Sequence, residues 1–453
     1  MSAYVIDSAL FRDQFSTTAT REIFSDEQTV QKWLDVEAAL AKVQGRMGII
    51  PEAAAREICA KARVELIDLA ELKKEMDRTS HPIVPLLRAM KKVCEGEAGE
   101  FIHWGATTQD ICDTGMVLQI REALAEIEKN TRQVYANVCA LAQRHRDLTM
   151  VGRSHGQQAL PITFGYKAAV WAEEIRRNLE RIDQLKARLL VGQFAGAVGT
   201  LAALGDQGVA VQQALFEELG LGSPEICWHV SRDNIAELSC VLAICTSTAG
   251  KIAHEIYCLQ KTETAELEEP FTMGKVGSST MPHKRNPPAC EGIVAISRIV
   301  RNTAALGIET IMAEHERDKI VLQTEREFVS RICCLSDAAA LKLAYVTGNL
   351  SVRSDKMERN LFTQKGLLLS EAVMMKLGDK IGRQEAHEIV YEICMDVFEN
   401  DGTFKEGLLS HALIANQLRE PDIDAMLDPH AYTGLAGQFV DSVVRRHAQS
   451  VKS

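Results

Sequence analysis

The sequence predicts an all-α protein of three helical domains, with a central bundle of five long helices. Three observations support this fold class. The chain has only 11 prolines in 453 residues and 5% aromatic residues, a composition that favours helix over sheet. Apolar residues recur at the helical period over stretches longer than an ordinary globular helix. Shorter helical patterns lie on both sides of these stretches. The hydrophobic content of 46% is ordinary for a globular chain.

Residues 1–110 are predicted to form a compact N-terminal domain of short helices. An irregular arm covers residues 1–20. The first helix follows Ser25 as its N-cap, with acidic residues in its first turn, and stops near Gly45. Further short helices are expected at 51–62, 66–77 and 83–93.

The central domain, residues 111–362, follows from five long helical patterns. The first covers 109–148 without a proline, and its apolar residues recur at steps of about 3, 4 or 7. A helix of this length would extend roughly 60 Å at about 1.5 Å per residue. Its apolar positions are Ile120, Leu124, Ile127, Val134, Val138 and Leu141. The other four patterns cover 163–191, 233–267, 288–315 and 323–350.

Some of these helices are apolar on more than one face. The run 241–245, Val-Leu-Ala-Ile-Cys, is an example. A helix with this pattern is usually buried on more than one side, so the bundle is predicted to mediate oligomerisation. After residue 362 glycines and a proline divide the helical pattern into shorter segments. Residues 363–453 are therefore predicted to form a small C-terminal helical domain.

Composition also limits the partners. The net charge of −11 argues against a nucleic-acid or anionic-membrane surface. The sequence shows no signal peptide and no uninterrupted apolar run of membrane-spanning length. The twelve cysteines form no CxxC pair and no zinc-like spacing. We therefore expect a cytoplasmic protein with reduced cysteines, no metal and no cofactor.

A polar loop at 274–288 separates two of the long helical patterns. Its segment Gly277–Pro287 begins with small residues that let the backbone curl and direct N–H groups inward, as in anion-binding nests. Lys284 and Arg285 add cationic donors suited to carboxylate or phosphate, and Asn286 adds a neutral donor. Prolines keep helix from extending into the loop. The segment predicts a site for an anionic ligand.

Three further polar clusters interrupt the helical patterns. Thr107 and Thr108 precede the first long helix, where a carboxylate could bind their hydroxyls and N–H groups. Alternatively, Thr108 only caps that helix. His155 lies between glycines, outside any apolar helix face, and histidine is the natural general acid or base near neutral pH. His81 has two interpretations, as a structural residue or as a catalytic partner.

Together these segments carry a family resemblance. The loop GSSTMPHKRNP resembles the signature loop of the fumarase/aspartase superfamily, in the form of adenylosuccinate lyases and 3-carboxy-cis,cis-muconate cycloisomerases. The segments HWGATTQD and GRSHG and the order of the five helices extend the resemblance over essentially the whole chain. It implies a homotetrameric helical core in which three subunits share each active site. It also implies anti β-elimination from a small polycarboxylate through an aci-carboxylate intermediate.

The resemblance also implies roles for individual residues. Ser278 corresponds to the catalytic base, His155 to the general acid, and His81 to the second histidine of the adenylosuccinate lyases. A serine hydroxyl is a poor base in water, so the loop's amides and Lys284 must stabilise its alkoxide. The positions that would hold the substrate are Thr107, Thr108, Ser154, Ser279, Met281, Lys284, Asn286, Arg317 and Arg326.

The substrate is harder to predict, because the chain departs from both groups. The arm through Arg12 to Asp26 resembles the cycloisomerases, and Arg317 matches both groups. Where the lyases have serines that help to bind phosphate, this chain has Ile320, Val321 and Leu322. A phosphate there would lack donors, at a cost of about 1–3 kcal/mol or more for each unmet partner. The segment 323–326 lacks the tryptophans common in the cycloisomerases.

The sequence thus predicts a cofactor-free lyase that cleaves C–N or C–O and releases fumarate, or a 3-carboxy-cis,cis-muconate cycloisomerase. A true adenylosuccinate lyase is a further alternative, and a catalytically inactive protein on the same scaffold is an alternative of another class.

Overall fold

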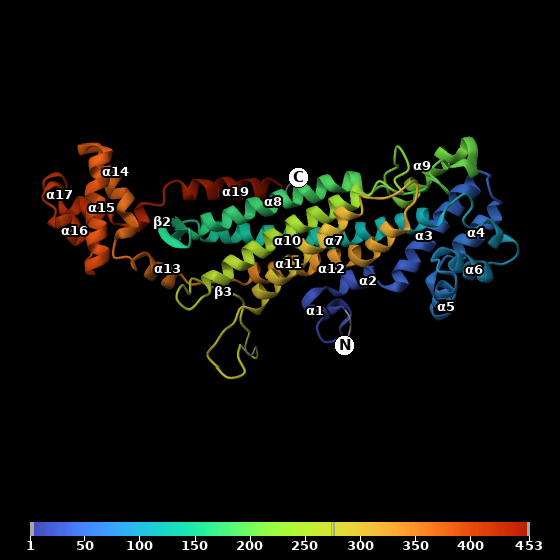
Figure 1. Cartoon of the computed structure of the whole chain (residues 1–453), viewed down its shortest axis with the longest axis horizontal. Helices are drawn as coiled ribbons and strands as arrows, with labels where there is room; N and C mark the ends of the chain where they lie inside the picture. The colour runs from blue at the N-terminus through green and yellow to red at the C-terminus, as the bar shows by residue number, and fades with distance from the viewer. Residues whose placement is uncertain (1–3, 273, 275–276, 451–453) are drawn as a thin grey trace. The chain divides into compact units, whose positions relative to one another are not determined.

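The computed structural model describes residues 4–272, 274 and 277–450 of the chain. It is an all-α protein, as predicted, with a few short strands (Figure 1). Its contacts divide it into two compact units. The first comprises Met1–Arg132, Arg177–Gly250 and Gly292–Lys342, and the second comprises Gln133–Arg176, Lys251–Glu291 and Leu343–Ser453. The division into domains at residues 110 and 362 remains a prediction.

Five long helices form the framework (Figure 1). They are α7 Thr108–Arg144, α8 Phe164–Leu189, α10 Asp233–Leu259, α11 Pro288–Glu309 and α12 Lys319–Gly348. Within the first unit all five contribute to one apolar core, which includes Ile120, Leu124 and Ile127 of the predicted stripe. Every residue of that stripe is buried. The helical period in the sequence therefore identified the face of α7 that packs inward.

The rest of the first unit consists largely of shorter helices. Four of them lie close to the predicted ranges, α3 Asp26–Arg46, α4 Glu52–Lys61, α5 Leu69–Thr79 and α6 Ile83–Val93. A further helix, α9 Gly208–Leu219, was not predicted. Ser25 caps α3 as predicted, since its hydroxyl accepts from Gln28 N at 3.2 Å. The prediction of an irregular arm was wrong over α1 Arg12–Phe15 and α2 Thr18–Ile23. The Thr17 hydroxyl starts α2 by accepting from Thr20 N at 3.2 Å.

The second unit holds two small antiparallel sheets that the sequence analysis did not predict. Strand β1 Thr149–Ser154 pairs with β2 Gln157–Thr163, and β3 Leu267–Glu268 pairs with β4 Ser351–Val352. The second pairing explains why α10 ends at Leu259, eight residues before the predicted end. The chain must leave the helix, through Ala265 at φ +54°, to reach β4.

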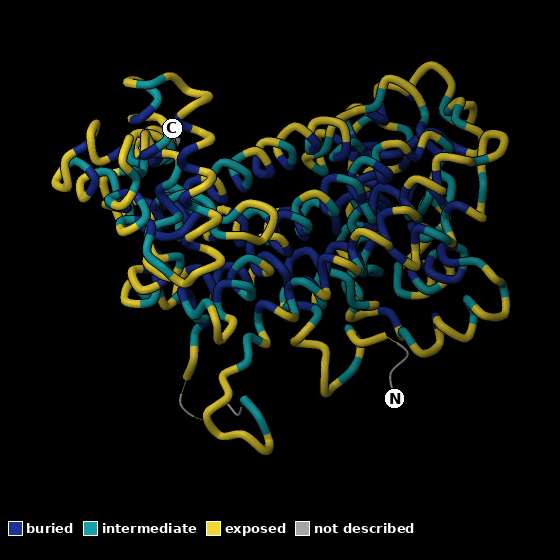
Figure 2. The backbone as a smooth tube through the Cα atoms, turned by 60° about the vertical axis from the view of Figure 1, so that its left-hand side comes forward, coloured by how far each residue is buried: buried dark blue, intermediate teal, exposed yellow. Residues whose placement is uncertain are grey.

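The C-terminal part of the second unit consists of shorter helices, and those between residues 370 and 426 share an apolar core of their own. The helices are α13 Ser354–Leu361, α14 Ser370–Ile381, α15 Arg383–Asn400, α16 Phe404–Ser410, α17 Ala412–Gln417, α18 Glu420–Met426 and α19 Ala436–Ser450. Val373, Leu377 and Ile393 are among the core residues of α14 and α15. Figure 2 shows the buried residues along the inward faces of the helices and the exposed residues on loops and outer faces.

One described helix, α10, is long and apolar enough to span a membrane by length and composition alone. However, 67% of its most apolar window is buried inside the protein. That burial is what a helix in the core of a bundle shows, because such helices contact neighbours on several sides.

Candidate active site

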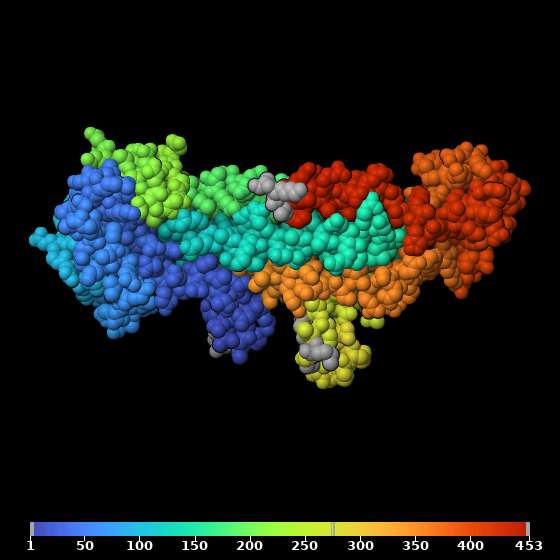
Figure 3. All heavy atoms as spheres, turned by 180° about the vertical axis from the view of Figure 1, so that it is seen from behind, coloured from blue at the N-terminus to red at the C-terminus, as the bar shows by residue number. Residues whose placement is uncertain are grey.

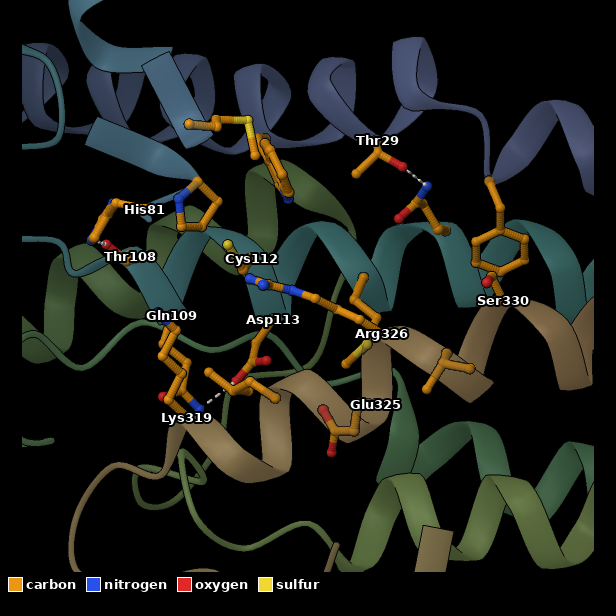
Figure 4. A pocket seen from close by; sticks show the side chains of 18 of the residues that line it. Thr29, His81, Thr108, Gln109, Cys112, Asp113, Lys319, Glu325, Arg326 and Ser330 are labelled. Atoms are coloured by element: carbon orange, nitrogen blue, oxygen red, sulfur yellow. Dashed lines mark hydrogen bonds between the residues drawn. The ribbon is translucent and has the colours of Figure 1, made fainter. Parts of the chain in front are cut away.

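A pocket of about 750 Å³ lies in the first unit, between the start of α7, the start of α12 and the loop before α6 (Figure 4). It contains four of the predicted site residues, His81, Thr108, Arg317 and Arg326. Its apolar walls include Phe24, Trp33, Met76, Met116, Leu322 and Val329. A few polar groups in a mostly apolar pocket are typical of a small-molecule site.

The hydrogen bonds of His81 define which of its nitrogens carries the proton. Val84 N donates to His81 Nδ1 at 3.1 Å, so Nδ1 is the unprotonated nitrogen. His81 Nε2 lies 3.1 Å from Thr108 Oγ1 and can donate to it. Burial lowers the pKa of His81, and the positive charges of Lys319 and Arg317 lower it further. His81 is therefore neutral near pH 7, with an Nε2–H that can donate into the pocket.

Thr108 does not use its side chain to cap α7. Its hydroxyl faces His81, while Asp110 Oδ2 accepts from Thr107 N at 2.9 Å at the start of the helix. Thr107 Oγ1 in turn accepts from Arg317 Nη1 at 2.8 Å. The two threonines thus bring a hydroxyl and a guanidinium to a helix N-terminus, which favours a carboxylate there.

Arg326 extends its guanidinium into the pocket toward Cys112 (Figure 4). Among the described residues its side-chain hydrogen-bond partner is Gln323 Oε1 at 3.0 Å, and no carboxylate pairs with it. Its charge is therefore available to an anionic ligand. Burial raises the pKa of the Cys112 thiol to about 12, so this cysteine stays protonated.

A buried ion cluster behind the pocket was missed by the sequence analysis. Arg232 is fully buried and donates to two carboxylates, to Asp113 Oδ2 at 2.8 Å and to Glu325 Oε1 at 2.7 Å. Its guanidinium also lies 4.9 Å from the ring centroid of Trp228. Both carboxylates line the pocket. Asp113 lies seven residues, about two helical turns, before Ile120 of the apolar stripe, so both residues lie on the same face of α7. A charged residue on that buried face was the sequence signal that could have predicted this cluster.

His155 lies at the tip of the β1–β2 hairpin in the second unit. Ser154 pairs with Gln157, so His155 and Gly156 form a two-residue turn, at φ +53° and +79°. Such turns need positive φ at both positions, which is uncommon for histidine and often marks a functional residue. The hairpin is anchored by Arg153, which donates to the buried Glu266 at 2.7 and 2.9 Å.

Ser278 lies in the loop before α11, which stands out from the surface of the second unit (Figure 3). Its hydroxyl accepts from Met281 N at 3.0 Å and from Thr280 N at 3.3 Å. Two amide dipoles therefore point at the oxygen on which negative charge would develop if Ser278 lost its proton. These amides are donors of the kind that an alkoxide at Ser278 would need, and the role of Ser278 as base stays a prediction. Lys284 forms no ion pair within the described residues, which leaves its charge available.

The loop is closed by tight internal contacts. Asn286 Nδ2 donates to Gly277 O at 2.5 Å. A Cβ at Gly277 would lie 1.9 Å from Lys284 O, so a side chain at 277 would push the two ends of the loop apart. Arg285 pairs with Glu268 at 2.8 Å and lies over the Phe271 ring. Its charge therefore stabilises the loop and is not available to a ligand.

The predicted site residues thus fall into three groups. The first unit brings together His81, Thr107, Thr108, Arg317 and Arg326. The second unit carries the other two groups, the hairpin with Ser154 and His155, and the loop with Ser278, Ser279, Met281, Lys284 and Asn286. Among the described residues no hydrogen bond joins His155 to a side chain of the loop.

The sequence matches known proteins over almost its whole length. It matches the family described as "Lyase" over residues 12–301 and "Adenylosuccinate lyase C-terminus" over residues 366–443. It is 42% identical to an N-acetyl-S-(2-succino)cysteine lyase from Enterococcus italicus, over 98% of this chain and 97% of the relative. It is 37% identical to a 3-carboxy-cis,cis-muconate cycloisomerase from Pseudomonas aeruginosa, over 97% of this chain and 96% of the relative.

The fold matches solved structures as well. The crystal structure of 3-carboxy-cis,cis-muconate lactonizing enzyme from Pseudomonas putida gives a TM-score of 0.93 at 35% identity, over 98% of this chain and 100% of that one. The protein is an enzyme with lyase or cycloisomerase activity. The chain belongs to the fumarase/aspartase superfamily, in the branch of adenylosuccinate lyases and 3-carboxy-cis,cis-muconate cycloisomerases, as the resemblance predicted.

Proposed function

We propose that the chain catalyses an anti β-elimination from a succinyl thioether, releasing fumarate and a thiol. Ser278 takes the proton from the carbon beside a carboxylate, and the electron pair is held as an aci-carboxylate. The pair then forms the double bond as the carbon–sulfur bond breaks, and the thiolate takes a proton from His155. A thiol has an ordinary pKa of about 8.5, so a thiolate is a good leaving group.

One observation carries this proposal, the combination of carboxylate donors and apolar walls in the pocket. The Thr108 hydroxyl, the neutral His81 and the guanidinium of Arg326 can hold carboxylates. Leu322 lines the same pocket and offers no donor to a phosphate. Of the other two residues that replace the lyases' serines, Val321 is 4% exposed and Ile320 is 74% exposed. The pocket therefore suits a polycarboxylate with an uncharged or apolar leaving group better than a nucleotide.

The Enterococcus italicus relative adds direct support for a thioether substrate, because its name specifies a succinylated cysteine. A second candidate is the interconversion of 3-carboxymuconate and its lactone. The 0.93 TM-score with the Pseudomonas putida enzyme favours that reading. Both reactions place carboxylates against the same donors and use proton transfer beside a carboxylate.

Turnover of three compounds tests the proposal. We expect N-acetyl-S-(2-succino)cysteine to yield fumarate, measured by its ultraviolet absorbance, and to yield free thiol in equal amount. The Ser278→Ala variant serves as the blank. Loss of the diene absorbance of 3-carboxy-cis,cis-muconate, without activity on the thioether, would replace the proposal with the second candidate. Fumarate from adenylosuccinate alone would contradict the argument from Leu322.

We further propose a cytoplasmic homotetramer whose active sites each combine the pocket of one subunit with the hairpin and the loop of others. The residues proposed to hold the substrate are Thr107, Thr108, Ser154, Ser279, Met281, Lys284, Asn286, Arg317 and Arg326. Large apolar side chains exposed on α10, α11 and α12 support association through the long helices. They include Ile244, Ile308 and Leu341, which are 44%, 54% and 46% exposed.

Shared sites predict complementation. Ser278→Ala and His155→Ala variants should each be inactive, and tetramers reassembled from equal amounts of both should regain activity. If loop and hairpin come from different subunits, about a quarter of the sites would carry both native residues. The measurement is turnover before and after denaturation and mixing, with each variant refolded alone as the control. No recovery in mixed tetramers of normal mass would count against shared sites.

A further inference from the structure

One cation of the pocket, Lys319, has no role in the reaction proposed above. It lines the pocket at the start of α12 (Figure 4). Its ammonium donates to Ser80 O at 3.2 Å, and among the described residues no carboxylate pairs with it. An ammonium has three N–H donors, so the bond to Ser80 leaves two of them for a ligand.

Three acidic side chains of the pocket are engaged with other groups. Asp318 accepts from two backbone N–H groups, at 2.8 and 3.2 Å. Asp113 and Glu325 both pair with the buried Arg232. These carboxylates therefore leave the positive charge of Lys319 available to an anionic ligand.

Lys319 and Arg317 are held at different points of the pocket wall. Arg317 donates to Thr107 Oγ1 beside the start of α7, whereas Lys319 donates to the carbonyl at the C-terminal end of α5. The positive charges of both residues lower the pKa of His81, so both lie near this imidazole. Two cations at separate anchors, with the hydrogen-bonding pair of His81 and Thr108 near them, match a ligand that has two carboxylates.

We propose that Lys319 binds the second carboxylate of the succinyl unit and so selects dicarboxylates, an inference that rests on the proposed elimination. The start of α7, with Arg317, holds the carboxylate beside the carbon that loses its proton, because amide and guanidinium donors suit its growing charge. Lys319 holds the carboxylate on the carbon that carries the sulfur. That carboxylate keeps the same charge throughout the reaction, so Lys319 contributes to substrate binding and not to the chemical step.

Binding of two compounds of the same shape tests this assignment. Fumarate has two carboxylates, and fumaramate has a neutral amide in place of one of them. We expect the native protein to bind fumarate about tenfold more tightly than fumaramate, measured by titration calorimetry. In Lys319→Met the affinity for fumarate should fall to that for fumaramate, and the affinity for fumaramate should stay the same. An equal loss for both compounds, or no loss for fumarate, would overturn the proposal.

Steady-state kinetics separates binding from chemistry. With the thioether substrate, Lys319→Met should raise KM about tenfold and leave kcat close to the native value, because the lost interaction is equally strong in the ground state and the transition state. Lys319→Arg should keep KM near the native value, because it restores the positive charge. A fall in kcat at unchanged KM in Lys319→Met would overturn the proposal.

Lys342→Met is the matched control. Lys342 lies on the same helix and also donates to a backbone carbonyl, Asp13 O at 3.4 Å, but it does not line the pocket. We expect this variant to keep the native KM and the native affinity for fumarate. An equal rise in KM in Lys342→Met and Lys319→Met would overturn the proposal, because loss of a lysine–carbonyl bond would then explain both results.

The failure of this inference is distinguishable from the failure of the proposed function. A native protein that releases no fumarate from the thioether contradicts the elimination. A native protein that releases fumarate but binds fumarate no more tightly than fumaramate contradicts only the role of Lys319. The comparison of the two compounds in the native protein needs no variant and no turnover.

Discussion

Ser278→Ala lowers turnover by about 10³-fold or more, because it removes the group proposed to take the proton from the substrate. The loop should keep its conformation. The hydroxyl accepts from the amides of Thr280 and Met281, and in the variant water can replace it, since this part of the loop is exposed. Steady-state turnover measures the loss of activity. Circular dichroism and the mass of the assembled protein measure whether the fold and the assembly are kept.

Thr280→Ala is the matched control for this experiment. Thr280 Oγ1 lies 3.4 Å from Ser278 Oγ, so the variant removes a neighbouring hydroxyl and keeps the amide that donates to Ser278. We expect it to retain most of the activity. If Ser278→Ala turns over at a near-normal rate, Ser278 is not the base. If Thr280→Ala is equally inactive, loss of the loop's conformation explains both results.

Arg232→Met destabilises the first unit by about 3–5 kcal/mol, because it leaves the carboxylates of Asp113 and Glu325 buried without a cation. Burial already raises the pKa of Glu325, and Arg232 is the group that opposes this rise. In the variant the pKa of Glu325 should rise further, so this carboxylate takes up a proton more readily. The loss of stability should therefore be largest at neutral pH and smaller in mild acid, as urea-unfolding midpoints at several pH values would show.

Arg188→Met is the control for burial. Arg188 also pairs with a carboxylate through two nitrogens, including Nε to Glu237 Oε2 at 2.8 Å, and it lies in the same unit. Its side chain is 58% exposed, so we expect a much smaller loss of stability than for Arg232→Met, because water screens an exposed pair. Equal losses in the two variants would show that the buried cluster contributes no more than a surface pair.

Local patterns predicted much of the fold correctly. The stripe through Ile120, Leu124 and Ile127 gave the inward face of α7, because helical periodicity reflects one-sided burial. Ser25 marked the start of α3, because a cap depends on residues only three positions apart. The β1–β2 hairpin was missed, because its turn places a histidine at positive φ, where hairpin turns more often have Asn, Asp or Gly.

The sequence by itself determined the long helices, the family and the residue types of the site, since each rests on local periodicity or on a motif. Only the tertiary structure decided which of those residues meet. It placed His81 beside Thr108, and Arg317 beside Thr107, from 210 residues further along the chain. It also revealed Arg232 between two carboxylates and His229 against Asp110. Such contacts depend on how distant helices pack, and no local pattern records that packing.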